Sequence, residues 1–237
     1  MTTSRRHALV LGGTGVIGGA VLAAFARAGL PTTFTYRRSE ERAHALATQY
    51  GHTAARIDLE NADEIRALYT RLETAPDVLV HCAAVHVART LADTTCEELD
   101  ASLRIAGRAT LVATQELARR LEEEKRPGHV VLVGALDRTQ SLPLSFAFAA
   151  AQGMMGAIAM ALAKELGHQD VRVNLVAGGP TGSGVSATLA PSLLRDYEKL
   201  SALRRLGTPD EIAAAVAFLA LENESMTGKV FAANGGI

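Results

Sequence analysis

The sequence predicts an α/β fold built on a doubly wound, seven-stranded parallel sheet. Short apolar runs typical of strands alternate with longer helical stretches along the whole chain, as in a parallel sheet with crossover helices. The strand-like runs are apolar with hardly a break, which is expected when helices cover both faces of the sheet. A cluster of glycines directly follows the first run, where such folds turn from strand into helix.

The strands and helices follow one another in regular alternation. Each predicted strand is a short apolar run bounded by polar or turn-forming residues, and a helical stretch fills most of the intervals. The predicted strands span residues 7–11, 32–36, 54–58, 78–81, 129–133, 171–176 and 230–233. The predicted helices span residues 16–28, 40–50, 62–72, 96–124, the alanine-rich stretch 145–167, and 209–221.

Residues 178–194 interrupt this alternation. They are rich in Gly, Ser and Pro, and this composition predicts a long loop or a mobile lid. The chain contains no internal repeat, low-complexity tract or linker. We therefore expect residues 1–237 to form a single domain.

The composition narrows the classes of function. Of 237 residues, 48% are hydrophobic and 21% charged, and the formal net charge is −1 without long runs of one sign. This argues against nucleic acid or an anionic membrane as the partner. Cys82 and Cys96 lack metal-ligand spacing and are expected to be free thiols. Glycines interrupt the apolar stretch after Arg5 and Arg6, and no run reaches the ~18 apolar residues of a membrane span, so we expect a soluble, cytoplasmic protein.

The glycines after the first strand predict a nucleotide site. Gly12, Gly15 and Gly18 follow a Gly-x-x-Gly-x-x-Gly spacing, with Thr14 inside the turn, and they open the first helix. Glycines allow the backbone to turn tightly and to approach a pyrophosphate over the helix N-terminus. The alternative is a tight strand–helix turn without a ligand. In this α/β context the pattern favours dinucleotide binding on a Rossmann-type sheet.

The end of the second strand indicates which dinucleotide is bound. An NAD site usually has a carboxylate there for the ribose 2′-hydroxyl, but this chain has Arg37 and Arg38. Guanidinium groups suit a 2′-phosphate, so NADP(H) is the expected cofactor. The alternative is a pair of solvated arginines at a helix start. Asp58, at the end of the third strand, is placed to reach an adenine amine, or alternatively to cap a helix.

Several motifs spread over nearly the whole chain belong together: ALVLGGTGVIGGAV, YRRSEE, IDLEN, DVLVHCAAV, GHVVLVGA, LAKELG, VRVNLVAGG and the tail RRLGTPDEIAAAVAFLA…MTGKVFAANGGI. With these motifs the chain resembles the short-chain dehydrogenase/reductase family, and is close to bacterial 3-oxoacyl-acyl-carrier-protein reductases and polyketide ketoreductases. The glycine spacing is nearer to that of extended and atypical members. The resemblance implies that Ile17, Asp58, Leu59, Ala83 and Ala84 line the cofactor, and that Thr181 and Ser183 meet its nicotinamide and pyrophosphate end.

The same resemblance implies that the family's catalytic groups are missing. The family uses a tyrosine, a lysine four residues later, a serine and an asparagine. Their positions correspond here to Phe148, Gln152, Ala135 and Ala106. No lysine follows any tyrosine at this spacing anywhere in the chain; the tyrosines are Tyr36, Tyr50, Tyr69 and Tyr197.

Other residues are candidate proton donors. His86 lies in a loop that borders the substrate pocket in this family, and His81 ends the fourth strand; a structural role is favoured for both over catalysis. A solvated loop is favoured over a pocket role for Asp137 and Arg138. Cys82 lacks an evident base and is not expected to be a nucleophile.

Two functions from different classes remain open. The first is an atypical NADPH-dependent, ketoreductase-like oxidoreductase that transfers hydride to a conjugated carbonyl, a quinone, or a polyketide or acyl-carrier-bound substrate. The second is a non-catalytic subunit that pairs with an active reductase or a carrier-protein complex. The intact cofactor end favours the first. The apolar helices predict a homodimer or homotetramer, with a hetero-oligomer containing an active family member as the alternative.

Overall fold

The computed structural model describes residues 6–135 and 144–237, which form a Rossmann-like domain. Its sheet has seven parallel strands in the order β3-β2-β1-β4-β5-β6-β7, and the predicted fold class is confirmed. All strand bounds lie within two residues of the predicted ones. The strands are β1 (Ala8–Leu11), β2 (Thr32–Tyr36), β3 (Thr53–Arg56), β4 (Val78–His81), β5 (Gly128–Gly134), β6 (Val171–Gly178) and β7 (Val230–Ala233).

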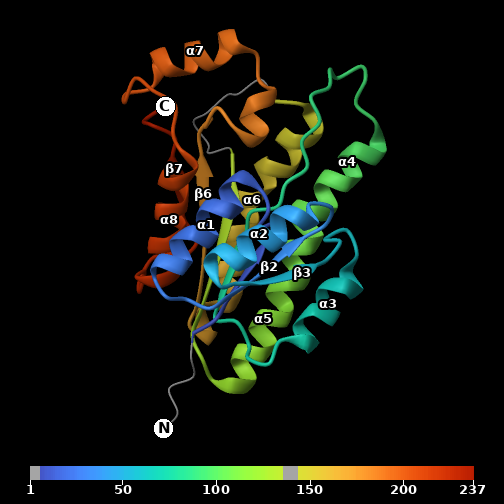
Figure 1. The fold of residues 1–237 in the computed structure, drawn as a ribbon, viewed down its shortest axis with the longest axis vertical. Coiled ribbons are helices and arrows are strands. Elements are labelled where there is room, and N and C mark those ends of the chain that lie inside the picture. The colour runs from blue at the N-terminus through green and yellow to red at the C-terminus, as the bar shows by residue number, and fades with distance from the viewer. Residues whose placement is uncertain (1–5, 136–143) are drawn as a thin grey trace.

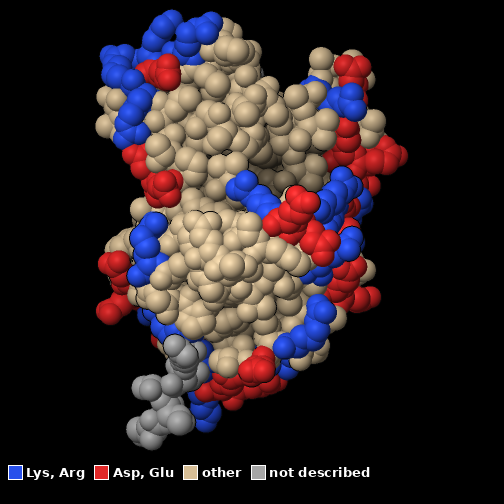
Figure 2. Space-filling model, viewed as in Figure 1, with Lys and Arg blue, Asp and Glu red and all other residues tan. Residues whose placement is uncertain are grey.

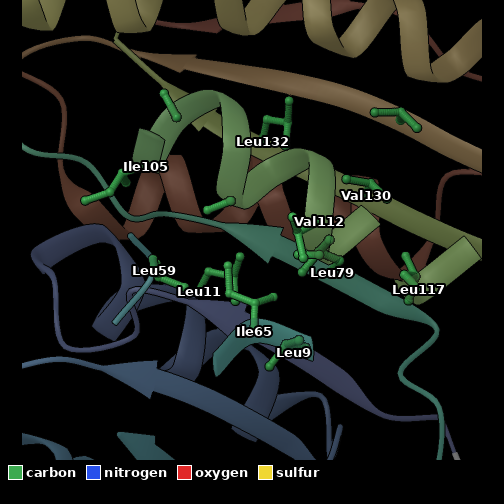
Figure 3. Packing of buried hydrophobic residues seen from close by; sticks show 14 of the residues in the cluster. Leu9, Leu11, Leu59, Ile65, Leu79, Ile105, Val112, Leu117, Val130 and Leu132 are labelled. Carbon is green, nitrogen blue, oxygen red and sulfur yellow. The ribbon is translucent and has the colours of Figure 1, made fainter. Parts of the chain in front are cut away.

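Helices cover both faces of the sheet, as Figure 1 shows. One face is covered by α1 (Val16–Arg27), α2 (Glu40–Tyr50) and α8 (Pro209–Leu221). The other is covered by α3 (Ala62–Arg71), α4 (Cys96–Leu103), α5 (Thr110–Glu124) and α6 (Phe146–Leu166). Successive residues of β1 point to opposite faces, so Leu9 and Leu11 join one core cluster and Ala8 and Val10 the other. Figure 3 shows Leu9 and Leu11 in the first cluster, with Ile65 of α3 and Leu79 of β4 close by.

The alanine-rich helix α6 is a core helix with one outer face. The segment Phe146–Gln169, which α6 begins, contains an 18-residue window of mean hydropathy 1.6, and this is sufficient for a membrane span by length and composition alone. Ala151, Met155 and Ala159 are nevertheless buried in the sheet's core cluster, whereas Phe146 and Met160 are exposed. Burial of that stripe against β6 accounts for much of the helix's apolar character.

The long helix predicted over residues 96–124 is divided by a π-helical segment, η1 (Arg104–Ala109). The carbonyl of Ile105 accepts a hydrogen bond from His81 Nε2 at 2.9 Å, and that of Ala106 accepts one from Thr110 Oγ1 at 2.6 Å. These side-chain donors satisfy carbonyl groups in the widened turn. His81 Nδ1 accepts from the Ala83 N–H at 3.2 Å, so both ring nitrogens are used and the histidine is structural.

The prediction of a loop over residues 178–194 was wrong in part. The segment contains the 3₁₀ turn η3 (Gly184–Thr188) and the start of α7 (Pro191–Leu200). Pro191 stands in the first turn of α7, where its fixed φ favours a helix start. The helix buries Tyr197 against the C-terminal strand region, where its hydroxyl contacts the Asn234 carbonyl at 3.4 Å.

Acid should destabilise the fold through its buried histidines. Burial lowers the pKa of His81, and burial followed by repulsion from Arg6 and Arg172 lowers the pKa of His129 to about 4. Burial also lowers the pKa of His7. The unfolded chain, with histidine pKa values near 6.5, therefore binds more protons than the folded chain between about pH 6.5 and 4. Stability that is present above pH 6.5 should be lost as the pH falls through this range.

Urea unfolding at pH 7.5, 6.5, 5.5 and 5.0 checks this expectation before most carboxylates titrate. His129→Gln should flatten the dependence, because glutamine does not take up a proton. A free energy of unfolding that stays constant or rises on acidification would contradict the assignment.

Candidate functional site

A cavity of about 440 Å³ opens at the carboxyl ends of β1, β4, β5 and β6. The strand order reverses at this point, because β2 pairs with one edge of β1 and β4 with the other. Doubly wound sheets bind ligands in the crevice at such a switch point. Figure 2, viewed from the same side as Figure 1, shows a hollow in the upper half of the molecule, between the parts that contain α7 and α4.

The turn from β1 into α1 provides a cradle for a phosphate group. Gly12 has φ +82°, and a Cβ there would lie 2.8 Å from the Ala83 backbone, so only glycine fits. Helix α1 has Gly15 as its N-cap, with no side-chain cap and no acidic residue in its first turn. Its N-terminal N–H groups therefore remain available to an anion. Gly12, Thr14, Gly15 and Ile17 all line the cavity.

Gly18 has a packing role. It does not line the cavity, and a Cβ on it would lie 2.3 Å from the Gly12 carbonyl oxygen. Its missing side chain lets α1 lie against the glycine turn, which is the role expected for the third glycine of this pattern.

Only the first of the two predicted arginines lies in the cavity wall. Arg37 lines the cavity beside Tyr36 and Ser39, whereas Arg38 is not part of the wall and is exposed. Arg37 Nη1 lies 2.9 Å from Glu60 Oε1 and 3.6 Å from Asp58 Oδ1. The prediction is therefore corrected for Arg38, which lies outside the cavity wall, whereas the role of Arg37 at a cofactor stays a prediction.

Asp58 lines the cavity but is held within its own turn. Its Oδ1 accepts a hydrogen bond from the Glu60 N–H at 3.0 Å. The alternative role as a helix cap is not observed, because Asn61 caps α3 by accepting from the Asp63 N–H. The remaining residues predicted to line the cofactor are found in the wall: Leu59, Ala83, Ala84, Thr181 and Ser183.

The far end of the cavity brings together three of the four residues at the predicted catalytic positions. Ala135, Phe148 and Gln152 line it, and Phe148 and Gln152 are 3% and 4% exposed. Ala106 lies in η1, buried in the core cluster and outside the cavity wall. Its side chain does not reach a ligand in this cavity.

The orientation of the Gln152 amide is fixed by its neighbour. The main-chain N–H of Ala135 can only donate, so the atom facing it at 3.0 Å is the oxygen Oε1. The amide nitrogen is then left with two donors, and no described residue accepts from it. Gln152 thus offers hydrogen-bond donors at this end of the cavity but no charge.

His86 stands beside the far end and outside the cavity wall. Its ring meets that of Phe148 edge-on, with centroids 4.9 Å apart, and its Nδ1 lies 3.3 Å from Thr188 Oγ1. The Thr188 hydroxyl donates its one hydrogen bond to the Val185 carbonyl. In the contact with His86, Thr188 Oγ1 is therefore the acceptor and Nδ1–H the donor. Burial lowers the pKa of His86, and the neutral ring is favoured near pH 7.

Cys82 lines the cavity, and burial raises the pKa of its thiol to about 12, so no thiolate forms near neutral pH. Asp137 and Arg138 lie outside the described residues. Within residues 6–135 and 144–237, no group of His, Cys, Asp and Glu is arranged to hold a metal ion.

Sequence reasoning missed several residues. Glu60 binds Arg37, and Arg104 binds Glu60 from η1; the IDLEN motif contains Glu60, but nothing in the sequence pairs it with Arg104. Val185, Ser186 and Leu189 of the segment predicted as a loop also line the cavity. Their position over the site depends on η3 and α7, which the sequence analysis did not predict.

Known proteins are similar to this chain over almost its whole length. A family model described as enoyl-(acyl carrier protein) reductase matches residues 14–237. A cyclic-di-GMP-binding biofilm dispersal mediator protein of Escherichia coli K12 is 29% identical over 96% of this chain and 94% of its own. Carbonyl reductase family member 4 of Xenopus laevis is 29% identical over 96% of each chain.

Solved structures of other proteins have the same fold over nearly the whole chain. BdcA in complex with NADPH superposes with a TM-score of 0.86 at 27% identity, covering 98% of this chain and 95% of the other. A short-chain dehydrogenase from Burkholderia cenocepacia J2315 in complex with NADP has a TM-score of 0.88 at 28% identity, covering 98% of each chain.

The packing of Gly18 can be tested by adding one methyl group. Gly18→Ala should destabilise the protein by about 1–3 kcal/mol, because the new Cβ meets backbone atoms that cannot move without opening the turn. Nucleotide binding should weaken with it. Denaturant unfolding and dye-free fluorescence titration with NADPH measure the two effects.

Gly19→Ala is the matched control in the same helix. Its Cβ would lie 3.6 Å from the nearest atom, Arg42 Nη2, which is ordinary contact. The control should keep or gain stability. Equal losses for both variants would show that close packing of Gly18 is not the cause.

Proposed function

The chain belongs to the short-chain dehydrogenase/reductase family, and from that premise we propose that it is an atypical, ketoreductase-like NADPH-dependent enzyme. At the coarser level it is an oxidoreductase of this family's type that binds NADP(H). The finer proposal is that it transfers hydride to a conjugated carbonyl, a quinone, or a polyketide or acyl-carrier-bound substrate. It does so without the family's tyrosine and lysine.

The cavity contains groups that suit each part of the cofactor. The uncapped N-terminus of α1 suits the pyrophosphate, and Arg37 suits the 2′-phosphate. Thr181 and Ser183 are assigned to the nicotinamide and pyrophosphate end. When bound, NADPH supplies the hydride that the reaction consumes.

The single observation that carries the proposal is that the described residues at the end of the cavity opposite Arg37 carry no charge. Phe148, Ala135 and Gln152 stand there, and the proposal assigns them, with Ala106, to the family's four catalytic positions. Phe148 keeps an aromatic ring but has no hydroxyl. A ketone whose reduction gives a localised alkoxide would need a proton at once, and none of these four side chains has an acidic proton to give.

Substrates with delocalised products avoid this need. Hydride addition to a quinone or an enone gives a phenolate or an enolate, and that anion takes its proton from water or from the substrate's own hydroxyl afterwards. The proposal assigns the amide N–H groups of Gln152, from which no described residue accepts, to a hydrogen bond with an oxygen of the ligand. Burial lowers the pKa of His86, which favours the neutral ring near pH 7, and its Nδ1–H donates a hydrogen bond to Thr188. A neutral imidazole is a poor acid.

The second candidate is a non-catalytic subunit that pairs with an active reductase or a carrier-protein complex. The observation in its favour is the same set of uncharged groups, together with exposed Phe146 and Met160 on α6 and Leu111 on α5. These apolar side chains support assembly under either function, as a homodimer, a homotetramer or a hetero-oligomer. One similar protein is named for binding cyclic di-GMP, so a nucleotide ligand without turnover belongs with this candidate.

Arg37 should determine the choice of cofactor. A charge-assisted contact contributes about 1.5–3 kcal/mol, so NADPH should bind roughly tenfold to a hundredfold more tightly than NADH. Arg37→Asp should narrow or reverse this ratio, measured by fluorescence titration with both nucleotides. Arg38→Asp makes the same change of charge one residue away, outside the cavity wall, and should alter the ratio far less. Equal affinity of the wild type for both nucleotides would refute the assignment.

An acceptor panel tests the chemistry. The wild type should oxidise NADPH with an electron-poor quinone or enone, and a simple β-keto thioester should be slower by the 10²–10⁴-fold that general acid catalysis usually contributes. Restoring Phe148→Tyr with Gln152→Lys should not be needed for turnover of the quinone. His86→Ala is the control, and a loss above roughly a hundredfold would make His86 the proton donor.

Two results would count against the proposal. NADPH binding without oxidation across the panel would favour the non-catalytic subunit. Efficient reduction of the β-keto thioester would show that an acid is present and that the assignment of the four positions is wrong.

A further inference from the structure

Glu60 connects the cavity wall to a residue outside it. Its Oε1 lies 2.9 Å from Arg37 Nη1, and its Oε2 accepts from Arg104 Nε at 3.2 Å and from Arg104 Nη2 at 3.0 Å. Arg37 follows β2, Glu60 lies between β3 and α3, and Arg104 is the first residue of η1. Neither Glu60 nor Arg104 lines the cavity. Figure 2 shows basic and acidic side chains side by side just below the hollow.

Arg37 keeps most of its donors for a ligand. Glu60 and Asp58 both contact Nη1, and no described residue accepts from Nε or Nη2. A guanidinium group has five N–H donors in a rigid fork, so the occupied nitrogen accounts for two of them at most. Because Arg37 lines the cavity, its Nε and Nη2 are the donors that remain for a ligand there.

The contact of Glu60 with a single nitrogen of Arg37 depends on Arg104. A carboxylate beside a guanidinium tends to bind it through both oxygens, and then competes with any phosphate for the same fork. Here the second oxygen of Glu60 is held by two nitrogens of Arg104, and its main-chain carbonyl receives Arg108 Nη2. Glu60 therefore has one oxygen left for Arg37.

We propose that Arg104, although outside the cavity, sets the preference for NADPH over NADH by holding Glu60 away from a two-point grip on Arg37. Arg104 is a positioning residue in this scheme, because it acts on the 2′-phosphate through Glu60 and Arg37. The inference rests on the proposed role of Arg37 at that phosphate.

Electrostatics predict that loss of Arg104 weakens the binding of NADPH. A 2′-phosphate carries about −1.5 to −2 charges near pH 7. Without Arg104, Arg37 is the only described ion-pair partner that the Glu60 carboxylate keeps. The carboxylate then repels the phosphate and also occupies the guanidinium group that should bind it. Asp58 near Arg37 and Asp100, 3.8 Å from Arg104, add negative charge to the cluster. The groups are partly exposed and screened, so we expect an effect of about three- to tenfold.

Direct binding measurements test the scheme without any substrate. NADPH and NADH would be titrated by nucleotide fluorescence or calorimetry into the wild type, Arg104→Ala, Arg104→Lys, Glu60→Gln and the double variant Glu60→Gln/Arg104→Ala. Arg104→Ala should weaken NADPH binding about three- to tenfold and leave NADH binding within twofold. Arg104→Lys should recover most of the loss, because it keeps the charge beside Glu60.

The Glu60→Gln variants show whether the effect passes through Glu60. Glutamine removes the competing charge, so Glu60→Gln should bind NADPH at least as tightly as the wild type. In that background Arg104→Ala should change NADPH binding by less than about twofold, since the interaction it acts through is gone. Arg119→Ala on α5, whose side chain pairs with Glu116 and Glu123, removes the same charge from an exposed ion-pair cluster and should have no effect.

Several outcomes would overturn the inference. The first is an equal loss of NADPH and NADH affinity in Arg104→Ala while the melting temperature is unchanged. The second is that Arg104→Ala weakens NADPH binding by the same factor in the wild type and in the Glu60→Gln background. Weaker NADPH binding by Glu60→Gln would also contradict it. If the wild type prefers NADPH and Arg37→Asp abolishes that preference while Arg104→Ala does not, this inference alone fails; if the wild type binds neither nucleotide, the proposed function fails as well.

Discussion

The close approach of the Gly12 backbone to the chain just after β4 is the constraint from which the site follows. A Cβ at Gly12 would lie 2.8 Å from Ala83, and one at Gly18 would lie 2.3 Å from the Gly12 carbonyl. These contacts hold the N-terminus of α1 directly over the carboxyl ends of β1 and β4, at the switch point of the sheet. The N-terminus of α1, which is suited to bind an anion, therefore faces the cavity.

The two ends of the cavity are chemically unlike. The nucleotide end contains Arg37 and Asp58, and with the neighbouring Glu60 and Arg104 it combines two positive and two negative charges from three segments of chain. The far end contains Phe148, Ala135 and the Gln152 amide, without an ionisable side chain among them. A site that binds a charged cofactor, and in which none of these three residues is an acid, is suited to acceptors that stabilise their own product anion. That contrast is the physical basis of the proposed chemistry.

The sequence predicted the sheet, the glycine turn and part of the cavity wall. These features depend on local rules: unbroken apolar strands need two covered faces, and a glycine is needed wherever the backbone comes closest to its neighbour. The sequence could not distinguish Arg37 from Arg38, because only the path of the chain after β2 decides which side chain enters the wall. The Glu60–Arg104 pair joins residues 44 positions apart, and no local pattern reports such a contact. The π-helical segment was missed for a similar reason, since its widened turn is matched by His81 from another element.

The central claim is that hydride leaves bound NADPH without an acid supplied by this chain. Paired isotope effects on the reduction of an electron-poor quinone test it most directly, with NADPH deuterated at the transferred position and, separately, with D₂O as solvent. The account predicts a clear primary isotope effect from the deuterated cofactor and a solvent isotope effect near one, unchanged in His86→Ala. A large solvent isotope effect that disappears in His86→Ala, or the absence of NADPH oxidation with every acceptor, would contradict it.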